Sequence, residues 1–420
     1  MERTSIESQA DENQIFQEEV WTDHQHNINT DLKLTKFAIS WKNTSKCHVY
    51  EAAKIIGAKL SPNDPTSTSI MIYKSVSRRF KIYHFWLSTA DSAKNWTEQI
   101  RTYSNTHQEN RHIAIILNPI SGTKSSRSVF RNEFQPALNY SGVNYTMFET
   151  AYPNFIEDWV KSQDVKQYTD IVCMGGDGTM HLLITALNKY HEGVMDSISF
   201  GMLPTGTRNA LSIEIGSKTA TQGIANIIKR RTFKGDIIKV MIESNCVLAT
   251  TAVAWGIVSD LCEEAQHYRF LGTFRYTAAG IKRVWQSWKV YSSILHYESK
   301  SGDLITHDDD FTYVVIGNHR ILNTANNEIM TPKARINDGM LDLLMVRCGG
   351  KWELLRVFQK TMNFGSHLDS ENVRYVKTKQ VMLEPKHTQV FNVDGEMYHS
   401  PTIQIQILPK SISYLGQTDY

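Results

Sequence analysis

Cysteine, long apolar runs and net charge are all scarce in this 420-residue chain, and each shortage excludes a class of protein. The five cysteines form no Cys-x-x-Cys pair, which argues against a zinc ribbon or a disulfide framework and favours a reducing, cytoplasmic compartment. No apolar run reaches the roughly 18 residues of a membrane-spanning helix, and residues 1–17 contain no apolar signal core, so a lipid would be met from the water side. A formal net charge of +2 without a long basic tract argues against nucleic acid as a partner.

An acidic, polar stretch occupies residues 1–30 and predicts a disordered lead-in, because it has little apolar surface to bury. Residues 31–104 change to short alternating runs that end in a helix-like stretch at 91–103. This pattern predicts a small β-barrel of pleckstrin-homology type. Four of its basic side chains lie close together in sequence: Lys74, Arg78, Arg79 and Lys81. They would either face anionic lipid or remain solvated on the surface, and both interpretations stay open.

The clearest motif is a glycine-rich turn at residues 175–179. Apolar residues 171–174 run directly into Gly-Gly-Asp-Gly-Thr, and helical spacing follows at 181–187, so we expect a buried strand, a turn and a helix. Glycine lets backbone N–H groups approach a polyphosphate, and a helix N-terminus attracts anions. Asp177 would repel phosphate unless it holds Mg²⁺ or accepts a proton from an attacking hydroxyl, which favours phosphoryl transfer. The alternative is that Asp177 only caps the helix.

Two further turns of small residues follow apolar runs of the buried-strand type. Residues 113–117 lead into a turn at 118–126, and residues 198–203 lead into a turn at 204–209. Because parallel strands end at the same edge of a sheet, we expect the three turns to converge there. The chain has neither the Gly-Lys-Ser/Thr ending of a P-loop nor a Gly-x-Gly-x-x-Gly motif. The pattern therefore predicts a nucleotide cleft built from separate loops.

Beyond residue 235 the chain is rich in strand-like runs and predicts a mostly antiparallel β domain. Within it, residues 273–290 have the spacing of a helix whose apolar face includes Phe274 and Trp285. This face would be either core or the lining of an apolar pocket for an acyl or alkyl chain. A β domain beside the nucleotide domain would leave the active site between the two.

Ordered motifs between residues 110 and 420 resemble those of the diacylglycerol-kinase-type lipid kinases. They are Asn118-Pro119 with Ser121-Gly122, residues 175–179, residues 203–207 with Asn209, residues 337–342 and Asp394-Gly395-Glu396. Residues 254–275 and 383–396 are most similar to sphingosine kinases, whereas a pleckstrin-like module and Ser400-Pro401 resemble ceramide kinase. The resemblance implies an α/β nucleotide-binding domain at 110–238. It also implies a β-rich antiparallel sandwich that binds lipid at 239–420, with a last strand able to return to the kinase domain.

The same resemblance implies that ATP and Mg²⁺ bind, and that Asp177 is the base that deprotonates the lipid's primary hydroxyl. The residues implied for the nucleotide are Asn118, Ser121, Gly122, Gly175, Gly176, Gly178, Thr179, Thr205, Gly206, Thr207, Asn209, Arg269, Arg275 and Glu396. Those implied for the metal are Asp177, Asp394 and Glu396, and those for the lipid are Trp255, Asp260, Cys262, Phe274 and Trp285. The two arginines would neutralise phosphate charge, with surface ion pairing as the alternative.

The chain also departs from the family pattern. In the phosphate loops, Lys124, Ser125 and Arg208 replace glycine or lysine, and Leu182 replaces a frequent glutamate. Sphingosine kinases carry a second acid for the substrate's ammonium where this chain has Cys262. Either Asp260 or a neighbouring glutamate substitutes for that acid, or the substrate has no free amine.

The leading function is therefore transfer of the γ-phosphate of ATP to the primary hydroxyl of a sphingoid lipid, foremost sphingosine to sphingosine 1-phosphate. Ceramide kinase or diacylglycerol kinase is the alternative. A degenerate kinase that binds nucleotide or lipid without turnover is the alternative of another class. A cytoplasmic enzyme associated peripherally with a membrane fits these functions, and the oligomeric state stays open.

Overall fold

The computed structural model describes residues 14–23, 25, 28–43, 46–105, 110–122, 124–207, 209–267, 289–299, 301–323, 328–363 and 365–418. Contacts between Cα atoms divide the chain into two compact units. The first contains the chain up to Ile113 together with Ser128–Thr146 and Thr219–Arg231. The second contains Ala114–Arg127, Met147–Lys218 and the chain from Thr232 onwards. No helix within the described ranges is long and apolar enough to cross a membrane.

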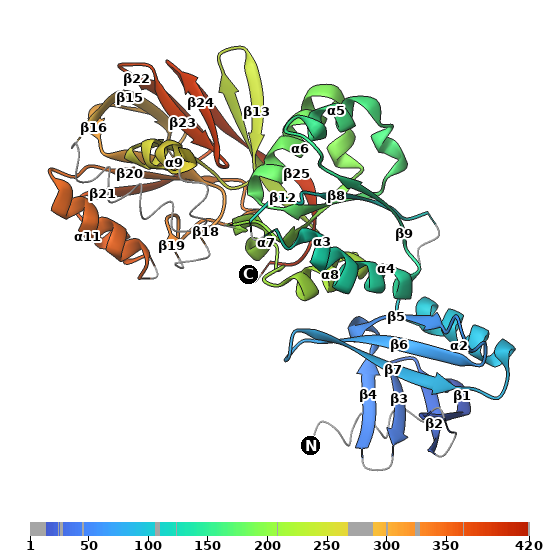
Figure 1. Cartoon of the computed structure of the whole chain (residues 1–420). Helices are drawn as coiled ribbons and strands as arrows, with labels where there is room; N and C mark the ends of the chain where they lie inside the picture. Colours follow the sequence, from blue (N-terminus) through green and yellow to red (C-terminus); the bar gives the residue numbers. More distant parts are fainter. Residues whose placement is uncertain are drawn as a thin grey trace. The chain divides into compact units, whose positions relative to one another are not determined.

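The first unit is built on a seven-stranded antiparallel sheet in the order β4-β3-β2-β1-β7-β6-β5 (Figure 1). The strands are β1 (Gln14–Trp21), β2 (Asn29–Thr35), β3 (Ala38–Asn43), β4 (Lys46–Glu51), β5 (Ile55–Leu60), β6 (Ser67–Lys74) and β7 (Arg79–Trp86). Helix α2 (Ala90–Tyr103) follows, begins where the Thr89 side chain accepts the Ser92 N–H, and buries Trp96 and Ile100. The predicted strands and C-terminal helix are thus present, and their assignment to the pleckstrin type stays a prediction.

Strand β1 corrects the expectation that residues 1–30 form a disordered lead-in. This stretch is polar overall, but Val20 is fully buried in the core of the sheet. The Trp96 indole N–H also donates to the Glu18 carboxylate over 2.8 Å, so an acidic residue of β1 is tied to α2. Four of the eight residues of β1 are apolar, and pairing with β2 satisfies its backbone.

Helices α4 (Gln135–Ser141) and α8 (Ala220–Ile228) also belong to the first unit. Strand β5 approaches α4 through Gly57, whose φ is +155° and whose Cβ, if present, would lie 2.2 Å from the Tyr140 carbonyl oxygen. Three cations donate to backbone carbonyl oxygens here: Arg101 to Ala58 and Tyr140, Arg111 to Ile227 and Ile228, and Lys229 to Ala52 and Ser104. Most of these carbonyls end helices, where cations are favourable.

The second unit contains a ten-stranded sheet whose central path is β16-β15-β22-β25-β11-β10-β8-β9. Its strands are β8 (His112–Leu117), β9 (Asn144–Glu149), β10 (Asp170–Gly175), β11 (Ser199–Pro204), β12 (Thr232–Ile242), β13 (Asn245–Ala249), β15 (Tyr291–Glu298), β16 (Leu304–Phe311), β22 (Gln380–Pro385) and β25 (Ile403–Leu415). Its helices in this part are α3 (Ser126–Val129), α5 (Phe155–Ser162), α6 (Asp177–Tyr190) and α7 (Ala210–Glu214). Strand β25 pairs in parallel with β11 and antiparallel with β12, so the last strand joins the nucleotide-domain sheet.

Strand β10 and helix α6 confirm the predicted strand, turn and helix around residue 177. Every residue of β10 is buried, which explains its continuous apolar run, and β10 pairs in parallel with β11. Helix α6 begins directly after Gly176 and buries Met180, Leu183 and Leu187.

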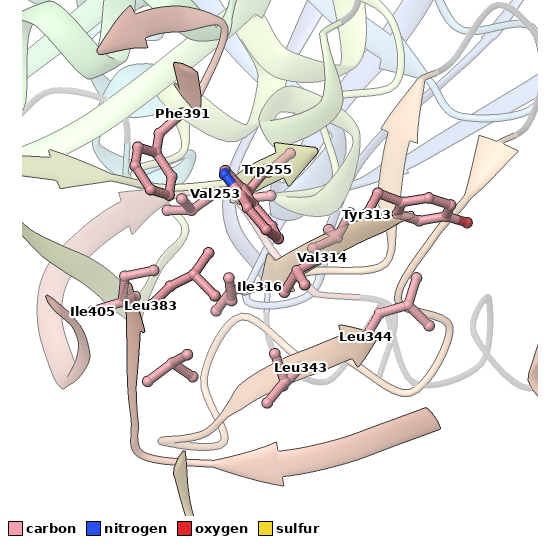
Figure 2. Close-up of a cluster of buried hydrophobic side chains, with 14 of the residues drawn as sticks. Val253, Trp255, Tyr313, Val314, Ile316, Leu343, Leu344, Leu383, Phe391 and Ile405 are labelled. Carbon is pink, nitrogen blue, oxygen red and sulfur yellow. The ribbon is translucent and has the colours of Figure 1, made fainter. Parts of the chain in front are cut away.

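A second, six-stranded sheet in the order β21-β20-β17-β14-β23-β24 completes a β sandwich. Its strands are β14 (Ala252–Gly256), β17 (Tyr313–Gly317), β20 (Leu341–Val346), β21 (Val373–Thr378), β23 (Gln389–Val393) and β24 (Glu396–Ser400). Strands β18 (Ile321–Asn323) and β19 (Glu328–Ile329) form a small hairpin, and helices α9 (Ile257–His267) and α11 (Lys351–Thr361) flank the sheets. Figure 2 shows Val253 and Leu343 of one sheet near Leu383 and Ile405 of the other, and all four belong to one buried core.

Candidate active site

The three predicted turns meet through their glycines. A Cβ on Gly206 would lie 2.3 Å from the Gly176 Cα, and a Cβ on Gly122 would lie 2.5 Å from the Gly206 carbonyl carbon. Gly122 also has a φ of +54°, in the left-handed region that favours glycine. The Ser126 hydroxyl donates to Thr205 Oγ1 over 2.9 Å and joins the first turn to the third. The predicted convergence of the turns is confirmed, and a side chain at Gly122 or Gly206 would separate them.

Asp177 lies at the centre of this junction. Its carboxylate accepts the backbone N–H groups of Ala210 (3.1 Å) and Leu211 (3.0 Å) at the start of α7, which follows the third turn. Asp177 therefore caps a neighbouring helix rather than its own. Each carboxylate oxygen keeps a lone pair for another partner.

Burial raises the pKa of the Asp177 carboxyl above its ordinary value. The negative charge of Asp394 raises the pKa further, whereas the two N–H donors and the nearby His319 oppose the rise. A carboxylate held by two backbone donors but made more basic by burial is suited to accept a proton from a bound hydroxyl.

Asn118, Thr179 and Asn209 hold the turns in shape. The Asn118 side-chain amide donates to Thr179 Oγ1 over 3.5 Å, and Thr179 Oγ1 lies where a Cβ on Gly175 would come within 2.5 Å. Asn209, with a φ of +53°, accepts the Gly206 N–H and donates to the Gly206 carbonyl oxygen. Ser121, Gly178 and Thr207 are half-buried, so these predicted nucleotide residues remain accessible in part.

Asp394 is held more tightly than the sequence suggests. Its carboxylate accepts four hydrogen bonds, from the N–H groups of Thr250, Thr251 and Ala252 and from the Thr250 hydroxyl, at 2.6–3.0 Å. Its φ of +51° is left-handed, and only 9% of the residue is exposed. Because both oxygens are occupied by the protein, Asp394 shapes the turn before β24, and this position does not support the prediction that it is a free metal ligand.

Glu396 lies beside the N-terminus of α6. Its Oε1 would be 3.4 Å from a Cβ on Gly178, which brings the Asp-Gly-Glu hairpin to the glycine turn. The link is reinforced by His181 of α6, whose Nε2 lies 3.0 Å from the Tyr398 hydroxyl oxygen on β24. Burial, together with the charges of Glu396 and Asp394, raises the pKa of Tyr398 to about 12, so its hydroxyl stays protonated.

His319 is the residue that the sequence reasoning missed. It follows β17, is fully buried, and has no hydrogen-bond partner on either ring nitrogen among the described residues. The Asn318 side chain donates to the Thr250 carbonyl oxygen beside Asp394, and Arg320 lies 3.8 Å from Glu214 of α7. His319 is therefore held between the segments that position the two aspartates. The sequence feature that could have indicated His319 is the polar triplet Asn318-His319-Arg320 directly after the buried strand β17.

The predicted lipid residues divide into three groups. Trp255 is fully buried in the sandwich core with its ring edge-on to Tyr291, and this position favours packing over contact with a substrate. Asp260 and Cys262 lie on α9, where the Tyr291 hydroxyl donates to Asp260 over 2.7 Å. Several predictions lie outside the described residues. They are the helix at 273–290 with Phe274 and Trp285, the phosphate ligands Arg269 and Arg275, and Arg208, which replaces a glycine of the family pattern.

Acidic and metal-binding side chains are sparse around the turns. Within the described ranges no three residues of the His, Cys, Asp and Glu types are grouped so as to hold a metal ion. A cavity of about 570 Å³ lies over strands β12, β15, β22 and β25 and includes Met241, Leu304 and Met382, so it is separate from the glycine turns.

Comparison with known proteins agrees with this arrangement. Residues 112–240 match the diacylglycerol kinase catalytic domain, and residues 251–416 match the YegS C-terminal NAD kinase beta sandwich-like domain. The first match contains the three glycine turns, and the second contains α9, His319 and the Asp394 hairpin.

Known relatives are similar at modest identity. Sphingosine kinase 1 of Arabidopsis thaliana is 24% identical over 333 residues, which are 70% of this chain and 68% of that protein. Human sphingosine kinase 1 is 25% identical over 346 residues (71% and 88%), and human ceramide kinase is 19% identical over 413 residues (77% of each).

A diacylglycerol kinase from Bacillus anthracis shares the fold over 74% of this chain and 99% of its own, with a TM-score of 0.57 and 18% identity. The order of the two matched domains and the converging glycine turns lead to one conclusion. The chain belongs to the diacylglycerol-kinase-type family of lipid kinases.

Proposed function

We propose that this lipid kinase transfers the γ-phosphate of ATP to the primary hydroxyl of a sphingoid lipid, with sphingosine as the favoured substrate. The observation that supports this most directly is the position of Asp177. Its carboxylate lies where three glycine turns meet and is oriented by the Ala210 and Leu211 N–H groups. A base fixed beside a phosphate-binding surface is what phosphoryl transfer to an alcohol requires.

The glycine turns would hold the phosphates of ATP, because Gly122, Gly176 and Gly206 let the three turns approach one another closely beside the N-terminus of α6. Asp177 and Glu396 are the carboxylates that would hold Mg²⁺ together with the phosphates, since Asp394 is occupied by four hydrogen bonds. When bound, Mg²⁺ would neutralise charge on the β and γ phosphates. Arg269 and Arg275 would add positive charge, as the family resemblance implies.

We assign the transfer of the lipid's hydroxyl proton to a side chain of the protein. Asp177 accepts the proton of the lipid hydroxyl as the hydroxyl oxygen attacks the γ-phosphorus, while the bond from that phosphorus to the bridging oxygen breaks and ADP leaves with its electron pair. The raised pKa of Asp177 favours the proton transfer. His319 is fully buried, and neither of its ring nitrogens has a hydrogen-bond partner among the residues that the structure describes, so a polar group of the bound lipid would satisfy them. We assign His319 to the lipid head group.

The choice between sphingosine and ceramide depends on α9. By the family resemblance, Asp260 is the candidate acid for an ammonium group, and its carboxylate accepts a hydrogen bond from the Tyr291 hydroxyl over 2.7 Å. The neutral Cys262 thiol is the specific observation that favours ceramide, whose amide carries no charge. Ceramide kinase is therefore the second candidate, with diacylglycerol kinase behind it.

A substrate panel tests the proposal. Purified protein would be incubated with labelled ATP and mixed micelles of sphingosine, ceramide or diacylglycerol, and the lipid phase counted for label. Incorporation into sphingosine above the other two lipids supports the assignment. Label in ceramide alone moves the assignment to the second candidate, and ATP binding without label in any lipid supports a degenerate kinase.

We also assign the enzyme to the cytoplasmic side of a membrane with peripheral association, because its proposed substrate has a long apolar chain that resides in a bilayer.

A further inference from the structure

Helix α11 carries an unusual exposed surface on the β sandwich. Leu354 and Val357 face inward as part of the sandwich core, and Phe358 stacks on Tyr313 with ring centroids 5.6 Å apart. Figure 1 shows α11 along the outside of the sandwich, so its other face is open to solvent. The helix is therefore firmly attached by one side, and the opposite side is free for another contact.

The exposed side is apolar at its centre. Trp352 is 73% exposed, Leu355 is 42% exposed, and Met362, which follows the last helical residue, is 50% exposed. Trp352, Leu355 and Met362 are three and seven residues apart, which places them along one stripe of the helix, and the polar Gln359 lies between the last two. Large apolar side chains gathered on an exposed stripe indicate an interaction surface, whereas single exposed ones need no explanation.

Positive charge surrounds this stripe. Lys351, Arg356 and Lys360 lie on the same helix, and Arg356 and Lys360 are exposed without an ion-pair partner in the part of the chain that the structure describes. The single acid of the helix, Glu353, is engaged elsewhere, because its carboxylate accepts the Gly349 N–H over 2.8 Å and the Asn372 amide over 3.4 Å. The surface, which we call the α11 surface, consists of Trp352, Leu355, Arg356, Lys360 and Met362.

We propose that the α11 surface lies on an anionic lipid bilayer. Tryptophan is favoured at the level of the lipid head groups, and short apolar side chains beside it enter the acyl boundary. Arg356 and Lys360 then face the negative head groups, where each contributes through attraction to the surface potential. The occupant rests on the proposed function, since a kinase whose lipid resides in a membrane must approach one.

Vesicle sedimentation of the full chain, without ATP, tests this surface. The variants are Trp352→Ser with Leu355→Ser, and Arg356→Gln with Lys360→Gln. The matched controls are Leu304→Ser, another exposed leucine at 67%, and Lys166→Gln, an exposed lysine on the other domain. Removing two interfacial cations should weaken partitioning into phosphatidylserine vesicles about 30-fold. Removing the two apolar side chains should weaken it about tenfold or more, and the controls should bind like the parent.

Activity on micellar substrate separates this inference from the proposed function. The α11 variants should keep parental turnover on micelles and lose it on vesicles, because the catalytic turns are untouched. Parental vesicle binding by both α11 variants would overturn the inference, even if the kinase activity is as proposed. The inference would also be overturned if vesicle binding were lost only when Val76, Arg78 and Arg79 in the basic hairpin of the first unit are changed. Because every substituted side chain is exposed, an unchanged melting temperature checks that the variants are folded.

Discussion

Replacing Asp177 by Asn separates the proposed chemistry from the local structure. The amide oxygen of Asn can still accept one of the two N–H groups of α7, but its NH₂ group then faces the other donor. One N–H left without an acceptor costs about 1–3 kcal/mol of stability. The loss of proton acceptance is the larger effect, since a positioned general base contributes about 10²–10⁴-fold to turnover.

The assay combines calorimetric ATP binding, turnover on the preferred lipid and urea unfolding. We expect ATP binding to persist, turnover to fall by about 10²–10⁴-fold, and unfolding to remain cooperative. In the parent, a raised Asp177 pKa places the acidic limb of kcat above the range of an ordinary aspartate, so activity falls as pH falls through that pKa. Glu396→Gln, which keeps Asp177, should retain this limb.

Near-normal turnover by Asp177→Asn with intact ATP binding would refute the reasoning. The carboxylate would then be a structural cap for α7, and the base would have to be sought elsewhere in the junction.

Four further predictions follow from the site. Asp394→Asn keeps the left-handed turn but leaves the Thr250 N–H facing an NH₂ group, so the free energy of unfolding should fall by about 1–3 kcal/mol. An unchanged urea midpoint would contradict the four hydrogen bonds that the Asp394 carboxylate accepts. Cys262→Asp should shift the substrate preference from ceramide toward sphingosine, and Asp260→Asn should weaken sphingosine binding by about 100-fold. If Cys262→Asp instead improves the use of ceramide, α9 does not contact the lipid head group. His319→Leu should raise KM for the lipid about tenfold while KM for ATP stays constant, and equal effects on both would make His319 structural. Burial lowers the pKa of Lys229 to about 7, below its unfolded value of about 10.4. Between these two pH values the folded state binds fewer protons than the unfolded state, so the free energy of unfolding should rise with pH. Urea unfolding of Lys229→Gln should not show this rise.

The nucleotide side of the site could be predicted because its signals are local in sequence. Strands β8, β10 and β11 are buried along their length and so read as continuous apolar runs, and each ends in a turn of small residues. Gly122, Gly176 and Gly206 are glycines because backbone approaches backbone there, which a motif records directly.

The rest depends on tertiary contacts that no local pattern contains. Strand β1 lies in a segment that is acidic overall, and its pairing with β2 and its hydrogen bond to α2 are contacts that the composition of this segment does not reveal. Asp394 looks like a free acid in sequence, yet its oxygens are taken by a loop more than one hundred residues earlier. His319 lacks a motif altogether, because its meaning lies in the burial and missing partners that only the fold supplies.

Strand β25 has a consequence for biosynthesis. It supplies the partner of β11 at Ser413 and Tyr414, and it also pairs along most of β12 and with β22. The sheet that carries the glycine turns is therefore completed by a segment that leaves the ribosome long after those turns. Such long-range pairing is slow to form and leaves strand edges open in the meantime. A nascent or C-terminally truncated chain that ends before Ile403 should consequently depend on chaperones and remain inactive, although every residue of its glycine turns has already been made.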